Sequence, residues 1–251
     1  VATQAYTLDT TAPTITPVTM SSNNAVSTLT IDGNTATITL TADETIQTPT
    51  CDVEVPDNTD ATNAESIENT NGNVWTCAVV LHDSDGDGAI VFSIVTTDVA
   101  GNPTTTTSTT DGTAVTHDDT VPVISTVAFA SGDYVNAVED NSAIDLVITM
   151  SDASANGQVA TATLNSATYT CTISTAACTA SITSAGLKDL TDGTSYSFSV
   201  AISDAAGNAA TAHTAESFLY DITAPSISNV VASWGDYLNA AEDNADGTVT
   251  V

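Results

Sequence analysis

The chain has almost no basic side chains. Its 251 residues include a single lysine or arginine, Lys188, against 31 aspartate and glutamate residues, which gives a formal net charge of −30. Nucleic-acid binding depends on Lys and Arg meeting phosphates, so nucleic acid is excluded as a partner. Docking on an anionic membrane surface is excluded on the same ground.

Aromatic residues and long apolar runs are also scarce. Aromatics make up 5% of the chain, so a packed core has to be built mainly from Val, Ile, Leu and Ala. No stretch approaches the roughly 18 apolar residues of a membrane span, so we expect no direct membrane insertion. There is no signal peptide, because Val1 begins within a polar β-like stretch. We therefore expect a segment that was cut from a longer, already processed chain.

Threonine and small apolar residues dominate what is present. Threonine fills 48 positions, and apolar residues fill 41% of the chain. Thr and Val suit a pleated, half-buried surface and are mediocre helix formers. The composition therefore predicts a β protein with packed cores.

An internal repeat of about 100 residues divides the chain. The segment Asp9–Pro13 recurs as Asp118–Pro122 and again as Asp221–Pro225, each time with Ile two positions and Val five positions after the proline. Between 120–148 and 223–251, 13 of 29 positions are identical. We predict the tail of one repeat (1–8), two complete repeats (9–117 and 118–220) and the start of a further one (221–251).

Each repeat reads as about seven short strands separated by turn residues. This count, with turns every 8–12 residues, predicts an all-β fold of tandem immunoglobulin-like Greek-key β-sandwiches. In the second repeat the expected strands cover 123–129, 143–150, 159–164, 169–174, 178–182, 195–202 and 209–218.

The four cysteines fall two per repeat and precede an Asp-Gly turn in each. An even count in matched places favours one disulfide per repeat, Cys51 with Cys77 and Cys171 with Cys178, over metal ligation. Disulfides place the protein outside the cytoplasm.

Three motifs resemble bacterial Ig-like repeats: the Asp-x-Thr-Ala-Pro linker, the Asp204–Asn208 turn with its copy Asp98–Asn102, and the Asn-Ala-x-Glu loop. Such repeats build the extender regions of very large adhesins and biofilm-associated proteins at the bacterial cell surface. In that family calcium commonly sits at the junctions between repeats and stiffens the rod. The resemblance thus implies Ca²⁺, with neighbouring repeats of the same or like chains as partners and a cell-surface or matrix ligand bound through other domains.

The Greek-key order sends acidic loops from two repeats to each junction. Hard oxygen ligands that converge with no Lys or Arg among them are what Ca²⁺ requires. At the first junction the predicted metal ligands are Asp83, Asp85, Asp87, Asp118, Asp119, Asp152, Asp204 and Asn208. At the second junction they are Asp133, Glu139, Asp140, Asn141, Asp189, Asp192 and Asp221. Each of these residues taken singly also suits a turn or a cap.

The first repeat departs from this pattern. It has Thr30 and Ile31 where the second has Glu139 and Asp140, so we expect its junction to bind less metal or to use other ligands. Asp83–Gly88 matches the first half of an EF-hand loop, but Ile94 stands at position twelve, so a weak calcium site and an acidic turn both remain open.

No catalytic motif is found, and we expect a structural protein rather than an enzyme. The favoured function is a calcium-stiffened extender or fibre segment of a secreted or cell-surface adhesin-like protein. Two alternatives stay open: a subunit of an extracellular filament or sheath, and an accessory region of a secreted carbohydrate-active enzyme. The run 104–110 suits O-linked sugar and a Thr-rich edge strand equally well.

Overall fold

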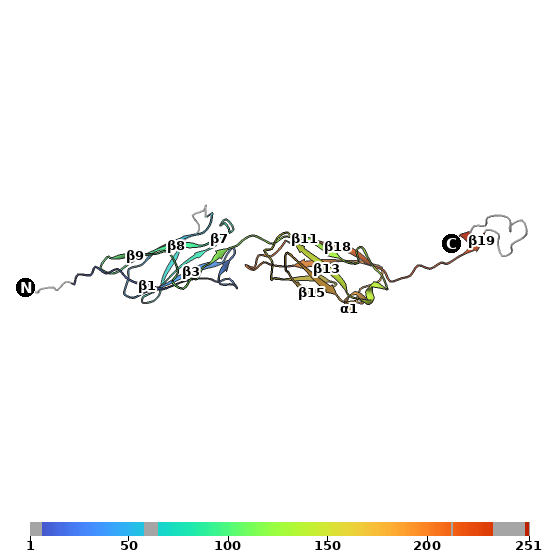
Figure 1. Cartoon of the computed structure of the whole chain (residues 1–251), viewed down its shortest axis with the longest axis horizontal. Coiled ribbons are helices and arrows are strands. Elements are labelled where there is room, and N and C mark those ends of the chain that lie inside the picture. The colour runs from blue at the N-terminus through green and yellow to red at the C-terminus, as the bar shows by residue number, and fades with distance from the viewer. Residues whose placement is uncertain (1–6, 58–64, 212, 233–248, 251) are drawn as a thin grey trace, which may run out of the picture.

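The computed structural model describes residues 7–57, 65–211, 213–232 and 249–250. Two groups of strands follow one another along the long axis of the molecule (Figure 1). Each group is a sandwich of mainly antiparallel sheets, so the predicted all-β, immunoglobulin-like fold class is confirmed. Residues 1–6 of the predicted tail 1–8, and residues 233–248 and 251 of the predicted further repeat 221–251, lie outside the described residues.

The first sandwich packs a four-stranded sheet, β1-β3-β6-β5, against a three-stranded sheet, β4-β8-β9. A small sheet of order β2-β10-β7 closes the end from which the chain leaves. The strands are β1 (Ile15–Ser22), β2 (Leu29–Thr30), β3 (Thr35–Ala42), β4 (Thr50–Glu54), β5 (Ser66–Asn71), β6 (Val74–Val80), β7 (Gly88–Ala89), β8 (Val91–Thr97), β9 (Pro103–Thr106) and β10 (Thr116–His117).

The second sandwich packs a three-stranded sheet, β11-β13-β16, against a five-stranded sheet, β12-β18-β17-β14-β15. Its seven long strands match the seven expected ranges to within a few residues at each end. The strands are β11 (Ile124–Phe129), β12 (Tyr134–Val135), β13 (Ile144–Met150), β14 (Val159–Leu164), β15 (Ala167–Thr172), β16 (Ala177–Ile182), β17 (Thr194–Ala201) and β18 (His213–Tyr220). Beyond it β19 (Val231–Ala232) pairs with β20 (Val249–Thr250).

The two sandwiches differ in where their edge strand lies. In the first, β5 pairs with β6 and joins the β1-β3-β6 sheet. In the second, β15 pairs with β14 and joins the opposite sheet. This difference was not predicted from the sequence.

Each sandwich has its own apolar core. The cores follow from alternation along the strands. In β3 the threonines are only half-buried, while Ala36, Ile38, Leu40 and Ala42 point inward and are buried. One cluster gathers buried residues between Val18 and Val115, and the other gathers buried residues between Ile124 and Tyr220. Burying one Ile or Leu side chain stabilises a fold by about 1.5–3 kcal/mol, so the many aliphatic residues of these cores offset the shortage of aromatics.

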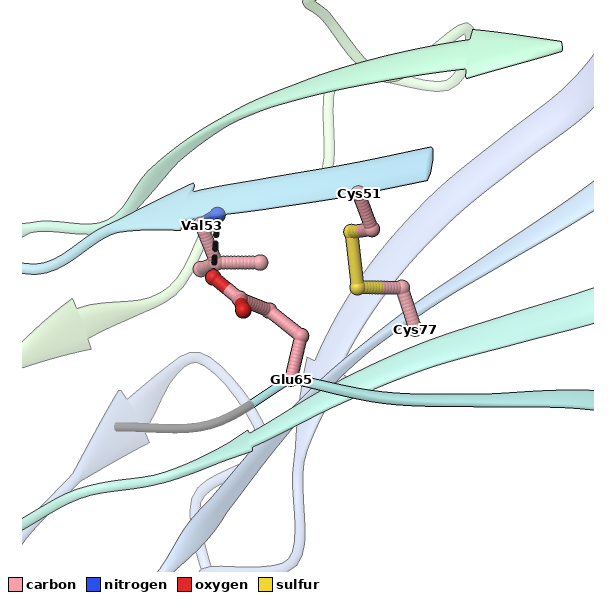
Figure 2. Close-up of a disulfide and its surroundings, with 4 residues drawn as sticks. All are labelled: Cys51, Val53, Glu65 and Cys77. Atoms are coloured by element: carbon pink, nitrogen blue, oxygen red, sulfur yellow. Dashed lines mark hydrogen bonds between the residues drawn. A yellow bond between two sulfur atoms is a disulfide. The ribbon is translucent and has the colours of Figure 1, made fainter. Parts of the chain in front are cut away.

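Both predicted disulfides are present, and each joins the two sheets of its sandwich. Cys51 on β4 bonds Cys77 on β6 with an S–S distance of 1.99 Å (Figure 2). Cys171 on β15 bonds Cys178 on β16 at 2.07 Å. Their places match only in part, because Cys51 and Cys171 lie on different strands of their sheets.

A buried polar pair ties the end of the last strand to the first loop in each sandwich. The Tyr220 hydroxyl donates to the Asp140 carboxylate at 2.8 Å, and burial with this contact raises the pKa of Tyr220 to about 12. In the first sandwich His117 Nδ1 lies 3.3 Å from Thr30 Oγ1 instead. His117 and Thr30 thus take the places that Tyr220 and Asp140 hold in the second sandwich.

Two short helical turns were not predicted. They are the 3-10 turn η1 (Glu139–Asn141) and α1 (Ser184–Lys188), which Thr183 caps by accepting a hydrogen bond from the Gly186 N–H. Within the described ranges, no helix combines the length and the apolar character that a membrane span needs.

Candidate functional site

A five-residue acidic turn has the same geometry in both sandwiches. In the second, the Asp204 carboxylate accepts hydrogen bonds from the N–H groups of Gly207 and Asn208, at 2.8 and 2.9 Å, and from Asn208 Nδ2. In the first, Asp98 accepts the equivalent bonds from Gly101 and Asn102. These turns lie at the end of each sandwich where the chain enters.

The turn also holds the incoming linker. Asn208 Nδ2 donates to the Asp118 carbonyl at 2.7 Å, and Asn102 Nδ2 donates to the Asp9 carbonyl at 3.2 Å. The first aspartate of each linker is thereby placed beside the acidic turn of the sandwich that the linker enters.

Three carboxylates meet at this end of the first sandwich. Asp9 from the linker, Glu44 after β3 and Asp98 of the turn bring ligand oxygens within 4.8 Å of one another. Asp98 is 1% exposed, Glu44 is half-buried and Asp9 is exposed. Burial and the charges of Asp9 and Asp98 raise the pKa of Glu44. Burial opposes ionisation of Asp98 as well, but hydrogen bonds from Asn102, Gly101 and Ala100 lower its pKa overall.

The second sandwich has the same residue types in the same places. Asp118, Asp152 and Asp204 occupy the positions of Asp9, Glu44 and Asp98, because Met150 before Asp152 and Ala42 before Glu44 both pair with the isoleucine that comes after the linker proline. Burial and the charge of Asp204 raise the pKa of Asp118. Asp152 is turned to the hydroxyl and N–H of its own loop, which lower its pKa. Over the described ranges, only the trio of the first sandwich lies within 4.8 Å.

A different pair of aspartates holds the outgoing linkers. The Asp87 carboxylate accepts a hydrogen bond from the Asp119 N–H at 2.6 Å and another from the Thr120 hydroxyl. Asp192 accepts from the Ile222 N–H at 2.8 Å and from the Thr223 hydroxyl at 2.5 Å. These contacts lower the pKa of both aspartates, and the bond from the Asp119 N–H has the larger effect at Asp87.

The other predicted ligands of the first junction lie in the loop before Asp87. Asp83 is exposed, and Asp85 is buried and accepts the His82 N–H at 2.8 Å. Together with Asp87 and Asp119 they lie at the end where the chain leaves the first sandwich.

The predicted ligands of the second junction lie in several separate contacts. Asp140 is buried on Tyr220, Glu139 accepts the Asn136 N–H at 3.1 Å, and Asp221 accepts the Thr223 N–H at 3.1 Å. Asp133 and Asp189 accept from Leu219 and Asn165 through their backbone carbonyls.

The expectation that no basic group lies among these ligands is wrong at Asn141. Lys188 Nζ donates to Asn141 Oδ1 at 2.8 Å. Helix α1 brings Lys188 to the loop that contains η1, a contact that sequence patterns alone did not indicate. The one lysine of the chain therefore lies at the second junction.

The trio of the first sandwich was not predicted, although the sequence carries a partial signal for it. The linker repeat aligns Asp9 with Asp118, and the turn repeat aligns Asp98 with Asp204. The linker register carries Asp152 to Asp43, one residue before Glu44, so the repeat points to two of the three carboxylates, and the strand pairing supplies the third.

Comparisons with solved structures identify the fold. The chain is similar to a structure described as a "Ca2+-stabilized adhesin" of an Antarctic bacterium that binds ice, with 21% identity and a TM-score of 0.50 over 91% of this chain and 54% of that one. Two further matches are a bacterial ice-binding adhesin of 1.5 MDa (20% identity, TM-score 0.48, 93% and 72% covered) and the I67–I69 fragment of titin (11% identity, TM-score 0.48, 84% and 66% covered).

These matches bear on architecture. The resemblance to a bacterial adhesin that the motifs indicated is confirmed at the level of the fold, and the chain spans about half the length of the Antarctic adhesin structure. No protein-family model matches the sequence. No curated protein matches it either.

Proposed function

We propose that the chain is a structural extender segment of a secreted or cell-surface, adhesin-like bacterial protein, stiffened by calcium, and not an enzyme. The observation that carries this proposal is the trio Asp9, Glu44 and Asp98 at the end of a sandwich, beside the linker through which the preceding repeat is joined. The similarity to an adhesin described as calcium-stabilised supports it.

Calcium suits this site on charge and ligand type. Ca²⁺ takes six to eight oxygen ligands from carboxylates, carbonyls and water, in flexible geometry. Three carboxylates within 4.8 Å repel one another, and this repulsion adds to burial in raising the pKa of Glu44. A divalent cation removes that repulsion. Asp118, Asp152 and Asp204 form the corresponding site at the first junction after a rotation of the Asp152 side chain.

The division into repeats belongs to the same proposal. Residues 9–117 and 118–220 fold as separate sandwiches, with boundaries near Pro13, Pro122 and Pro225. The two separate cores support this scheme, and so does a small sheet at the end of the first sandwich that stops at His117.

An extracellular location follows from the disulfides and from calcium supply. Disulfides persist in oxidising compartments. Extracellular calcium modules bind with Kd of about 10⁻⁴–10⁻³ M, which requires a calcium-rich medium.

Small-angle scattering and calorimetry, with calcium and then with chelator at matched ionic strength, test the function. Metal at 100 times its Kd adds about 2.7 kcal/mol per site that binds only the folded form. We therefore expect a lower melting temperature in chelator, with a small widening of the distribution of inter-repeat angles about an unchanged mean angle. Scattering curves and melting temperatures that coincide in the two buffers overturn the calcium proposal.

A further inference from the structure

We propose that a hydrogen-bond clasp, formed by Asp87, Asn208 and Asn24, sets the angle between the two sandwiches without metal. The clasp deepens the proposed extender function, since it bears on how a junction is stiffened, but it does not depend on calcium. Asp87 joins the first sandwich to the linker, Asn208 joins the second sandwich to the linker, and Asn24 joins the two sandwiches directly.

The outgoing half of the clasp holds the linker to the first sandwich. Asp87 lies in the Asp-Gly turn before β7, and its two carboxylate oxygens take the Asp119 N–H and the Thr120 hydroxyl. Asp192 makes the same two contacts to Ile222 and Thr223, one repeat later. Because the arrangement recurs, it is a property of the repeat rather than of one loop.

The incoming half holds the linker to the second sandwich. Asn208 Nδ2 reaches back to the Asp118 carbonyl, as Asn102 reaches back to that of Asp9. Asn208 is buried, and the Asp204 carboxylate fixes its amide, so the donor is already oriented. Three consecutive linker residues, 118–120, are thus bound on both sides.

The third contact bypasses the linker and joins the sandwiches directly. Asn24, in the loop after β1, donates through Nδ2 to the Ala206 carbonyl at 2.9 Å. The same amide donates to Asn34 Oδ1 at 2.8 Å, and the Asn24 N–H is held by Ser22 Oγ. Ala206 is 2% exposed and lies inside the Asp204–Asn208 turn, so this contact fixes that turn against the first sandwich.

The consequence is a preorganised junction. The clasp holds Asp118 beside Asp204, because Asn208 Nδ2 donates both to the Asp118 carbonyl and to the Asp204 carboxylate. Neutral donors, namely amides, a hydroxyl and backbone N–H groups, make all of these contacts, as a chain with one lysine requires. Ligands that are already gathered lose less conformational entropy when a cation arrives.

The test compares the full chain with Asn24→Ala by residual dipolar couplings, first in chelator and then in calcium. In chelator the wild type is expected to show one alignment tensor for both sandwiches, whereas Asn24→Ala shows two. In Asn24→Ala the calcium affinity of the junction is expected to fall about fivefold, which corresponds to the loss of one net hydrogen bond. Asn69→Ala is the matched control, because the Asn69 amide donates to the Gly72 carbonyl within the β5–β6 hairpin.

Each result has a defined meaning. If Asn24→Ala keeps a single tensor in chelator, or if the wild type already shows two, the clasp is overturned whether or not calcium binds. If the wild type keeps one tensor in chelator and calcium changes nothing, the clasp stands and the calcium proposal fails. Asp87→Ala serves as a second variant, in which both acceptors of the linker are removed and the same loss of a common tensor is expected.

Discussion

At the scale of single residues, the carboxylates fall into two groups that differ in the sign of their pKa shift. Asp87 and Asp192 accept two hydrogen bonds each and have lowered pKa values. Glu44 and Asp118 lie where burial and other carboxylates disfavour ionisation, and their pKa values are raised. The first group stabilises the fold as ions. The second stabilises it only when protonated or when a cation is bound.

Glu44→Gln separates these effects. In chelator the variant is expected to melt at a higher temperature than the wild type, because it removes one of three clustered charges. In calcium it is expected to gain less stability than the wild type, because a ligand is lost. Calorimetry in both buffers measures the two changes.

Glu54→Gln is the control for this prediction. Glu54 is an exposed carboxylate on β4, outside the trio, so its removal changes net charge equally without touching the cluster. Equal behaviour of the two variants in both buffers contradicts the assignment of Glu44 to a metal site.

Asp87 gives a pH dependence with a definite sign. Its pKa in the folded protein is below the ordinary value of 3.8, so its contribution is complete above that value and is lost as the pH falls through the lowered pKa. Asp87→Asn is therefore expected to lose less stability than the wild type between pH 5 and about pH 2. Urea unfolding across this range measures the difference. Asp145→Asn, an exposed substitution on β13, is the control and is expected to follow the wild type. If Asp87→Asn loses as much stability as the wild type between pH 5 and about pH 2, the prediction is contradicted.

At the scale of elements, alternation and turn residues were enough to predict the long strands. The stretch 195–202 alternates in sequence, and Phe198, Val200 and Ile202 are buried in the structure. The side to which an edge strand pairs was not predictable, because β5 and β15 are both largely exposed and carry little apolar patterning. Helix α1 is one turn long and depends on a single cap at Thr183, which is too short for a periodic signal.

The placement of the disulfides on particular strands was also not predictable from the sequence. Pairing was readable from spacing, whereas the strands that carry Cys51 and Cys171 depend on the path of the edge strand. Both bonds nevertheless link the two sheets of their sandwich in the folded protein. In the unfolded chain each bond closes a loop and so lowers the conformational entropy.

Removing the two bonds separately is expected to have unequal costs. The half-cystines are 26 residues apart in the first sandwich and 7 apart in the second. Loop-closure entropy then assigns about 3.5 kcal/mol to the first bond and about 2.4 kcal/mol to the second. Urea unfolding of Cys51→Ala/Cys77→Ala and of Cys171→Ala/Cys178→Ala, monitored by amide signals of each sandwich, measures both. The unmodified sandwich is the internal control, and a larger loss in the second pair contradicts the entropy argument.

At the scale of the whole molecule, net charge decides which junction contacts are available. The sequence predicted which loops lie at each end of a sandwich, because Greek-key order fixes their ends. It did not show which side chains converge, since a carboxylate can turn to its own loop, as Asp152 does, or toward a neighbour, as Glu44 does. That choice depends on single rotamers and on neutral donors nearby.

The same charge predicts an unusual response to salt. In most proteins salt screens attraction and repulsion together, but here 31 acidic residues face one lysine, so screening removes almost only repulsion. In chelator, the melting temperature is expected to rise steadily as NaCl increases from about 0.01 M to about 0.5 M, while the Debye length shrinks from about 30 Å to a few ångströms. With calcium bound the rise is expected to be shallower, because the junction carboxylates are already neutralised. Choline chloride at the same ionic strength separates screening from sodium binding, and a melting temperature that stays flat or falls with salt contradicts the view that self-repulsion limits this fold.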